Sequence, residues 1–427
     1  MKYSEIKWIG EIPENWNVRK VKQCFYISKE QAHEDNPTIL SLARAGVKVR
    51  DISNNEGQLA ASYDNYNPVM PGDLLLNPMD LYSGANCSLS EVGGVISPAY
   101  INLRKKVELN PKFYDYYFKT QYWAMAMFAH GKGVSFDNRW TMNAETLLNY
   151  YLPFPSSDVQ DKIVDLINKK TAEIDSLIEI ENQQIEKLKE YKQAVITEAV
   201  TKGLDKNATM KDSGVEWIGK IPEGWNVKRA KFIAEEFIKG SGITKEDVLI
   251  DGDIPCVRYG EIYTKYDNYF NECVTRTNLS NVSSPTFIEK GDLLFTCTGE
   301  LVEEIGKNVL YLGEEKCIAG GDIIVMKHKQ HPGFINYAMN CTRSQMQKSY
   351  GKAKLKVVHI SSLGIGNVYV CLPSYDEQKN VSDYLDDFTE AINEIILIKQ
   401  QKIEQLGEYK KSLIYEYVTG KKEVIVW

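Results

Sequence analysis

The sequence predicts an α+β fold in which two pseudo-two-fold-related domains are separated by two long antiparallel helices that form a coiled coil. Three observations support this prediction. The chain repeats itself in the order A–B–A′–B′, its B segments carry an uninterrupted helical stripe of apolar residues, and its A segments alternate short apolar runs with turn residues. The length of 427 residues suits two or three domains of about 150 residues each.

The repeat is strongest where each half opens and where each half ends. Residues 8–18 read WIGEIPENWNV and residues 217–227 read WIGKIPEGWNV, so nine of eleven positions are identical at an offset of 209. Residues 185–201 and 403–419 match at ten of seventeen positions, at an offset of 218. The interiors diverge between these matched frames. That divergence favours two domains of one architecture with two different targets, with neutral drift after duplication as the alternative.

Segments B and B′, residues 156–204 and 375–427, are each predicted to form a long spacer helix. Apolar residues recur at heptad-like spacing from Ile163 to Ala199, and no Pro or Gly interrupts them. About 44 residues of helix span roughly 65 Å. Because one such helix cannot bury its stripe alone, we expect the two to pair with each other. The alternative is that each packs separately on its own domain.

Segments A and A′, residues 1–155 and 205–374, are predicted to form domains of short strands. Runs such as GDLLLN, GDLLFTCTG and GGDIIVMK are bounded by turn residues. One helix is predicted over residues 111–129, with a counterpart over 332–348. The aromatic side chains there recur at helical spacing, so they are expected in the core rather than on a surface that stacks bases.

Taken alone, the net charge of −7 argues against a nucleic-acid partner, but the charge is unevenly distributed. The first domain segment holds 16 basic and 16 acidic residues and the second holds 21 of each, whereas the helical segments hold 7 against 10 and 7 against 11. The acidic excess therefore lies wholly in the predicted helices. Neutral domains leave room for local basic patches that face phosphate.

Candidate DNA-binding residues lie in basic or aromatic clusters of the two domain segments. The lysines of GKAKLK alternate at period two, which places them on one face of an extended strand. The two arginines at 139 and 258 are the candidate base readers, because Arg can pair guanine bidentately. For any single position a solvated surface role is the alternative. The candidates are Arg44, Lys48, Arg50, Lys132, Arg139, Trp140, Lys239, Arg258, Tyr259, Lys352, Lys354 and Lys356.

Motifs of catalysis and of membrane insertion are missing from the sequence. GELVEEIGKN has the wrong spacing for a phosphate-binding loop, and there is no HExxH pattern. The eight cysteines have no CxxC spacing and are interpreted as reduced thiols. No apolar run reaches the ~18 residues of a membrane span, and MKYSEIKWIGE has no apolar signal region. We therefore expect a cytoplasmic chain with no catalytic residue, metal or cofactor of its own.

Together, these features resemble the DNA-specificity subunit of type I restriction–modification systems. The resemblance rests on the two WIG…WNV motifs and on the junctions LPFPSSDVQDKIVDLI and LPSYDEQKNVSDYL. It rests also on IEKLKEYKQAVITEAVTKG, which is similar to the family's first spacer helix.

The resemblance implies a function. Residues 1–155 and 205–374 would be target recognition domains, each reading one half of a bipartite, asymmetric site in double-stranded DNA. The helices would fix the gap between half-sites and dock two modification subunits that methylate adenine, joined by restriction (motor–nuclease) subunits. S-adenosylmethionine, ATP and Mg²⁺ would belong to those partners, and this chain would be non-catalytic. A degenerate or structural coiled-coil scaffold without DNA recognition is the alternative.

The helical stripe is interrupted by charges near the middle of each spacer helix. Heptad steps lead from Ile174 and Leu177 to Glu181, and the equivalent position in the second helix is Lys399. Opposite charges at core positions would fix orientation and register if they paired. The alternative is that both side chains reach solvent.

Overall fold

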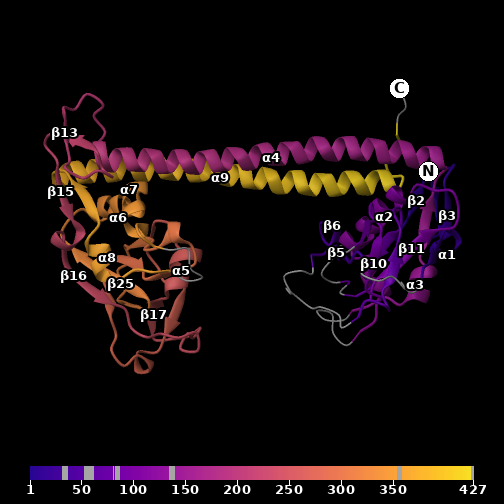
Figure 1. The fold of residues 1–427 in the computed structure, drawn as a ribbon, viewed down its shortest axis with the longest axis horizontal. Helices are drawn as coiled ribbons and strands as arrows, with labels where there is room; N and C mark the ends of the chain where they lie inside the picture. Colours follow the sequence, from indigo (N-terminus) through magenta and orange to yellow (C-terminus); the bar gives the residue numbers. More distant parts are fainter. Residues whose placement is uncertain are drawn as a thin grey trace. The chain divides into compact units, whose positions relative to one another are not determined.

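The computed structural model describes residues 1–30, 37–51, 62–79, 81, 87–133, 140–352 and 358–424. These residues form two compact units, Met1–Glu181 with Gln400–Trp427, and Asn182–Lys399. The boundary between the units crosses the two longest helices, α4 (Ser157–Lys202) and α9 (Tyr375–Val418) (Figure 1). α4 begins and ends within two residues of the predicted segment 156–204, whereas α9 begins at the predicted residue 375 but ends nine residues before the end of its segment, at Val418.

In the first unit the start of α4 pairs antiparallel with the end of α9. Lys410 Nζ donates to Asp175 Oδ1 at 2.6 Å, and six residues further along α4 Glu181 accepts from Lys402. In the second unit, Lys399 donates to Gln184 Oε1, and eight residues further along α4 Lys192 Nζ donates to Asn393 Oδ1 at 2.9 Å. Within each unit, residues further along α4 contact residues earlier in α9. This is the antiparallel pairing that the sequence predicts.

The first unit is built from short antiparallel strands. Its main sheet has the order β4-β11-β8-β9, and the remaining strands form two-stranded pairs. The strands are β1 (Lys2–Tyr3), β2 (Glu11–Ile12), β3 (Asn17–Lys20), β4 (Phe25–Ile27), β5 (Leu40–Ala43), β6 (Gly46–Val49), β7 (Asn67–Val69), β8 (Leu74–Leu76), β9 (Cys87–Leu89), β10 (Gly94–Ile96), β11 (Ile101–Lys105) and β12 (Tyr151–Phe154). The helices are α1 (Val21–Cys24), α2 (Pro111–Trp123), the 3₁₀ turn Phe128–His130 and α3 (Ala144–Leu148).

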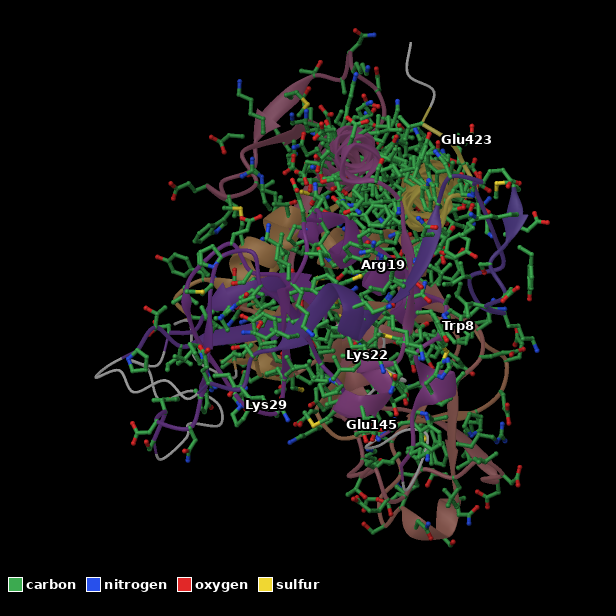
Figure 2. The ribbon with its side chains drawn as sticks, turned by 90° about the vertical axis from the view of Figure 1, so that its right-hand side faces the viewer. Trp8, Arg19, Lys22, Lys29, Glu145 and Glu423 are labelled. Carbon is green, nitrogen blue, oxygen red and sulfur yellow. The ribbon has the colours of Figure 1, made fainter. Side chains whose placement is uncertain are left out.

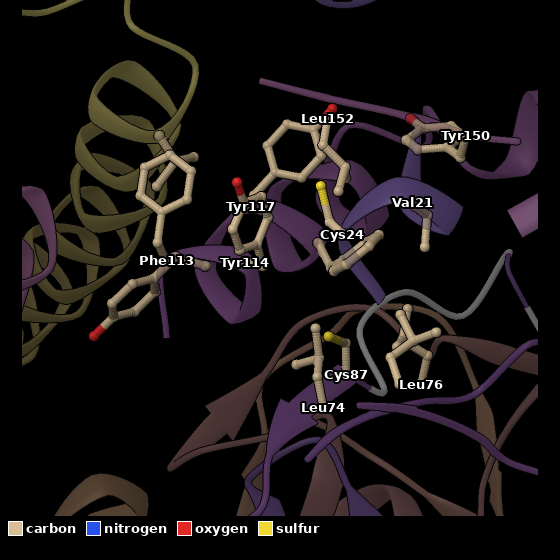
Figure 3. Close-up of a cluster of buried hydrophobic side chains, with 14 of the residues drawn as sticks. Val21, Cys24, Leu74, Leu76, Cys87, Phe113, Tyr114, Tyr117, Tyr150 and Leu152 are labelled. Atoms are coloured by element: carbon tan, nitrogen blue, oxygen red, sulfur yellow. The ribbon is translucent and has the colours of Figure 1, made fainter. Parts of the chain in front are cut away.

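The core of the first unit packs α2 between the main sheet and the long helices. Phe113, Tyr114 and Tyr117 of α2 are fully buried beside Cys24 and Leu74 (Figure 3). The same cluster includes apolar residues from the start of α4 and the end of α9. The aromatic residues of this helix are therefore core residues, as their spacing predicts.

The second unit has two sheets. A five-stranded sheet has the order β16-β25-β21-β23-β18, and a four-stranded sheet has the order β19-β17-β24-β20. The strands are β13 (Met210–Asp212), β14 (Lys220–Pro222), β15 (Asn226–Arg229), β16 (Ala234–Lys239), β17 (Ile254–Val257), β18 (Tyr269–Phe270), β19 (Thr275–Thr277), β20 (Phe287–Ile288), β21 (Leu293–Thr296), β22 (Thr298–Gly299), β23 (Asn308–Tyr311), β24 (Cys317–Ala319), β25 (Ile323–His328), β26 (Val358–His359) and β27 (Tyr369–Leu372). The helices are α5 (Tyr259–Thr264), α6 (Pro332–Asn340), α7 (Thr342–Ser349) and α8 (Ser362–Gly366), with 3₁₀ turns at Ala230–Phe232, Leu279–Asn281 and Val302–Glu304.

The two units share one scaffold. The order β4-β11-β8-β9 of the first unit corresponds to β16-β25-β21-β23 of the second, and the pair β3–β12 corresponds to β15–β27. Lys20 lies over the ring of Tyr151, 5.2 Å from Nζ to the centroid, and at the equivalent positions Arg229 lies over Tyr369 at 5.0 Å. The sheet β19-β17-β24-β20 also has a counterpart in the first unit, where β6 pairs antiparallel with β5, a parallel bridge joins Ile39 to Val95 of β10, and β10 pairs antiparallel with β7.

The repeated WIG…WNV motif packs its last tryptophan against the end of a long helix. α9 is followed by Gly420 (φ 73°), where an added Cβ would lie 2.4 Å from Pro13 Cδ and 3.1 Å from a ring carbon of Trp16. α4 is followed by Gly203 (φ 74°), where a Cβ would lie 3.1 Å from a ring carbon of Trp225. The left-handed backbone and the close approach both favour glycine. In each unit the motif therefore receives the end of one spacer helix.

A buried glutamine joins the start of each long helix to its domain. Gln160 accepts from the backbone N–H of Asn110 at 2.8 Å and donates to the carbonyl of Pro155 at 2.9 Å. Gln378 repeats this arrangement in the second unit, accepting from His331 N at 3.0 Å and donating to Pro373 O at 3.1 Å. The glutamines that occupy equivalent sequence positions thus have equivalent roles.

The shorter helices differ from the prediction. The helix expected over 111–129 ends at Trp123, because Met125 adopts a left-handed backbone (φ 54°) that a helix cannot include. The counterpart expected over 332–348 is two helices, since Cys341 between α6 and α7 is extended (φ −66°, ψ 157°).

Candidate nucleic-acid interface

The hairpin β5–β6 carries the first basic cluster. Its register pairs Leu40 with Val49 and Ser41 with Lys48. Leu40 is buried, so strand alternation places Lys48 on the opposite, exposed face. Arg44 lies exposed in the turn, and Arg50 is half-exposed just beyond β6. The structure therefore brings all three candidates of this cluster to one hairpin.

The second cluster follows α2. Lys132 is exposed and exchanges two backbone hydrogen bonds with Thr141, of 2.8 and 3.0 Å, which close the intervening loop. Trp140 donates Nε1–H to the carbonyl of Phe128 at 2.8 Å and stacks on the Phe128 ring. The indole thus packs against the core of its unit. Arg139, the candidate base reader of this loop, lies outside the described residues.

Near this loop, aromatic contacts hold the opening motif. Trp8 stacks on Tyr150, with ring centroids 5.2 Å apart, and meets the His130 ring edge-on at 4.7 Å. Arg19, labelled with Trp8 in Figure 2, lies 3.8 Å above the Phe154 ring. The Trp8–His130 contact therefore joins the opening motif to the 3₁₀ turn that precedes Lys132.

Lys352 occupies the corresponding loop of the second unit. Its Nζ donates to the carbonyl of His359 at 2.5 Å, which joins the two ends of the loop between α7 and β26. His359 in turn contacts Thr298, Nδ1 to Oγ1 at 3.2 Å. The other two lysines of GKAKLK, Lys354 and Lys356, lie outside the described residues.

Lys239 and Arg258 are brought together although 19 positions separate them. Val257 at the end of β17 pairs with Ala319 of β24, and Ser241 forms a parallel bridge with Gly320. A Cβ on Gly320 would lie 3.4 Å from the Cα of Arg258, and one on Gly240 would lie 2.0 Å from the carbonyl oxygen of Gly320. The two cationic residues therefore flank one crowded junction of strand ends.

A nearly buried carboxylate holds the Arg258 guanidinium. Glu261 Oε1 accepts from Arg258 Nε at 3.1 Å and from Nη2 at 2.9 Å, while Oε2 accepts from the Arg258 backbone N–H at 3.0 Å. Thr275 Oγ1 donates to the same Oε2 at 3.1 Å. The neighbouring Tyr259 is 40% exposed. A guanidinium fixed in this way loses less conformational entropy when it binds a ligand.

The sequence pattern did not identify Glu261 as the partner of Arg258, nor Gly320 as the residue at the strand junction. The signals were present, since Glu261 follows Arg258 by three residues at the start of a helix and Gly320 opens a Gly-Gly pair. They were weak because i,i+3 acid–base pairs are common and a glycine pair alone indicates only a turn.

The two central helix charges lie in different units, so a Glu181–Lys399 pair stays a prediction. Within the first unit, Glu181 Oε1 accepts from Lys402 at 2.5 Å. Within the second, Lys399 donates to Gln184 Oε1.

A groove of about 960 Å³ lies in the second unit between the domain and the helix pair. Burial raises the pKa of Asp386 and lowers that of Lys307, both of which line the groove. Its charged lining residues are Asp267, Glu304, Asp386, Glu390 and Glu394 against Lys192 and Lys307. This acidic lining disfavours phosphate and suits a cationic protein segment.

Apolar side chains are exposed on both spacer helices. In the first unit they are Leu177, Ile180 and Tyr409, and in the second Tyr191, Tyr375, Tyr384, Ile395, Leu397 and Ile398. Apolar residues gathered on a helix surface are typical of a protein-binding surface.

Across the described residues, no group of three or more His, Cys, Asp or Glu side chains is arranged to hold a metal ion. In the same part of the chain, no helix has both the length and the apolar character of a membrane span.

Comparisons with known proteins agree with the fold. Residues 222–405 match the type I restriction modification DNA specificity domain. The type I restriction enzyme MjaVIII specificity subunit of Methanocaldococcus jannaschii is 23% identical over 368 residues, covering 83% of this chain and 80% of that protein. The putative type I restriction enzyme MjaX specificity subunit of the same organism is 24% identical, covering 67% of this chain and 63% of that protein.

Two solved structures share the fold. One, from a study of complex assembly and conformational transition of the type I R-M system, has a TM-score of 0.71 at 13% identity and covers 96% of this chain and 100% of its own. The other, the HsdS subunit from Thermoanaerobacter tengcongensis, has a TM-score of 0.51 at 13% identity and covers 96% and 98%. The resemblance found in the sequence is thus confirmed: residues 222–405 match the type I restriction modification DNA specificity domain, the chain is similar to type I specificity subunits over most of its length, and it shares the fold of these two solved structures.

Proposed function

We propose that this specificity subunit recognises a bipartite, asymmetric site in double-stranded DNA and directs adenine methylation and restriction by partner subunits. The observation that supports this most is the duplicated scaffold. Both units have the same sheet order and the same motif–helix contacts, yet their sequences diverge between the matched motifs. One frame with two different surfaces suits two readers of different half-sites.

In the first unit, the β5–β6 hairpin and the loop that starts at Lys132 are the proposed DNA-facing elements. In the second, they are the strand junction at Lys239 and Arg258 and the loop that starts at Lys352. Exposed lysines would contact phosphate, and Arg258, oriented by Glu261, would read a base edge.

The spacer helices would set the gap between half-sites and dock two modification subunits, with restriction subunits as further partners. Their exposed apolar residues and the acidic groove support protein contacts rather than DNA contacts on this part of the chain. S-adenosylmethionine, ATP and Mg²⁺ would be bound by those partners in the cytoplasm.

A domain exchange tests the proposal. Residues 205–374 are replaced by the matching segment of a related specificity subunit, and methylated sites are mapped by methylome sequencing in cells that contain the modification subunits. We expect one half-site to change while the other half-site and the gap stay the same. Changes in both half-sites would contradict modular reading.

The unaltered chain serves as the matched control. If cells with and without it have the same methylome while it still binds the modification subunits, the chain is a scaffold without DNA recognition.

A further inference from the structure

Two cysteines of the second unit lie within reach of a covalent bond. The Sγ atoms of Cys273 and Cys317 are 2.8 Å apart, although 44 positions separate them in the chain. A disulfide bond measures about 2.05 Å, so the two sulfurs need to approach by less than about 1 Å to bond. Cys317 begins β24, and Cys273 lies in the segment between β18 and β19.

The two thiols differ in access. Cys317 is fully buried, whereas Cys273 is half-exposed. The pKa of Cys317 is raised by its hydrogen bond with Cys273 and by burial. A third thiol, Cys256 of β17, is buried on the strand next to β24. An oxidant from solvent therefore meets Cys273 first.

We propose that Cys273 and Cys317 are an oxidation site that forms a reversible disulfide when a peroxide reaches the second unit. The Cys273 sulfur attacks one peroxide oxygen, so that an S–O bond forms, the O–O bond breaks and one water leaves. The Cys317 sulfur then attacks the Cys273 sulfur. The S–S bond forms, the S–O bond breaks, and the hydroxyl leaves as a second water with the Cys317 proton.

In all, two thiols lose two hydrogens and one hydrogen peroxide becomes two waters. Two molecules of a low-molecular-weight thiol reverse the change by exchange: the first forms a mixed disulfide and frees one cysteine, and the second releases the other cysteine and leaves with the first as a disulfide.

The bond would fasten the segment that supports Arg258. After Cys273, the Val274 N–H donates to Tyr266 Oη at 3.0 Å, and Thr275 donates to Glu261. Glu261 in turn holds the Arg258 guanidinium. A bond from Cys273 to β24 would restrain Val274 and Thr275, and through them the Glu261 carboxylate that holds Arg258.

Peptide mapping of the full-length chain tests the proposal. The protein is treated with graded hydrogen peroxide, alkylated, digested and analysed by mass spectrometry with and without reductant. We expect one linked peptide pair containing Cys273 and Cys317, lighter by two hydrogens and lost on reduction. A link between Cys256 and Cys317, or sulfinic acid at Cys273 without any link, would overturn the proposal.

Variants and hydrogen exchange complete the test. Cys273→Ser should abolish the link, whereas Cys371→Ser, at a buried thiol of another sheet, should leave it unchanged. Cys273 is half-exposed, so its serine variant should fold; a far-ultraviolet circular dichroism spectrum like that of the parent checks this.

Oxidation should slow amide exchange several-fold over residues 273–276 and raise the melting temperature of the second unit by several degrees. Unchanged exchange there in the linked protein would overturn the restraint. None of these measurements depends on DNA binding.

Discussion

Lys402 donates a hydrogen bond to Glu181 across the helix pair of the first unit, with Nζ 2.5 Å from Oε1. The Glu181 side chain is 7% exposed, whereas that of Lys402 is 55% exposed. The lysine thus extends from the solvent side to a carboxylate at a core position, which would be costly without a partner. Lys399 precedes Lys402 by three residues and therefore lies on the same face of α9.

Reversing the charge of Glu181 should destabilise the chain. Glu181→Lys places a cation near Lys402 at a buried site, and we expect a loss of about 2 kcal/mol in the free energy of unfolding. Lys402→Glu in the same chain should restore part of the loss. Denaturant unfolding of the single and double variants measures this. The double variant Glu181→Lys with Lys399→Glu tests the predicted Glu181–Lys399 pair. If this double variant is no more stable than the Glu181→Lys single variant, the two residues do not pair.

Gln160 and Gln378 should be equally important to their units. Changing either to Ala leaves a buried N–H and a buried carbonyl without their partner, at a cost of about 2 kcal/mol in the free energy of unfolding. Urea unfolding of each variant gives the loss. Lys169→Ala, on the exposed face of α4, is the matched control and should change stability little. A loss no larger than that of the control would contradict the bridging role.

The buried Lys348 should make the stability of the second unit depend on pH. The side chain is fully buried and donates to Gly306 O at 2.6 Å, and burial lowers its pKa to about 7. Between pH 7 and about 10.4, the ordinary pKa of lysine, the unfolded chain binds a proton that the folded chain lacks. The free energy of unfolding should therefore rise with pH over this range.

Lys348→Met should flatten that rise, because methionine does not titrate. Urea unfolding at pH 7, 8, 9 and 10 compares the slopes of the two proteins. Parallel pH profiles would show that Lys348 does not titrate differently in the folded and unfolded states.

Arg258→Ala should relax specificity at one position of one half-site. A bidentate Arg–guanine contact is worth about 1–3 kcal/mol of discrimination, and the other half-site should be unaffected. Glu261→Gln should give a smaller loss in the same half-site, since it weakens only the support of the guanidinium. Binding to a panel of DNA duplexes, with the modification subunits present, measures both. Equal losses on all sequences would make Arg258 a phosphate contact.

The lysines of GKAKLK should contribute to the salt dependence of binding. Changing Lys352, Lys354 and Lys356 to Ala should flatten the plot of log affinity against log salt, by up to ~0.9 per lost phosphate contact. Titrations at several salt concentrations measure the slope. The same slope in parent and variant would mean that these lysines are merely solvated.

The long elements could be predicted from the sequence because their signals are periodic and repeated. The apolar stripe predicted both spacer helices, and the matched repeat offsets predicted that the two units share one scaffold. The ends of the short helices could not be predicted, since the left-handed backbone of Met125 and the extended Cys341 depend on tertiary packing.

The candidate site was predictable only in part. Closeness in the sequence grouped Arg44, Lys48 and Arg50, and one hairpin, β5–β6, holds all three. The meeting of Lys239 and Arg258 at Gly320 depends on strand pairings distant in sequence, which no local pattern reports. Trp140 shows the same difficulty, because its stacking on Phe128 requires a loop closure.

The two units also differ in how they can form during synthesis. The second unit is one continuous stretch, Asn182–Lys399, whereas the first needs Gln400–Trp427 as well as residues 1–181. Leu413, Ile414 and Val418 belong to the core of the first unit, and Lys421 donates to the carbonyl of Ile9 at 3.0 Å. A ribosome makes the end of a chain last, at about 5–20 residues per second. The domain translated first is therefore the one completed last, and until α9 emerges, the apolar face that receives it stays uncovered for a chaperone to protect.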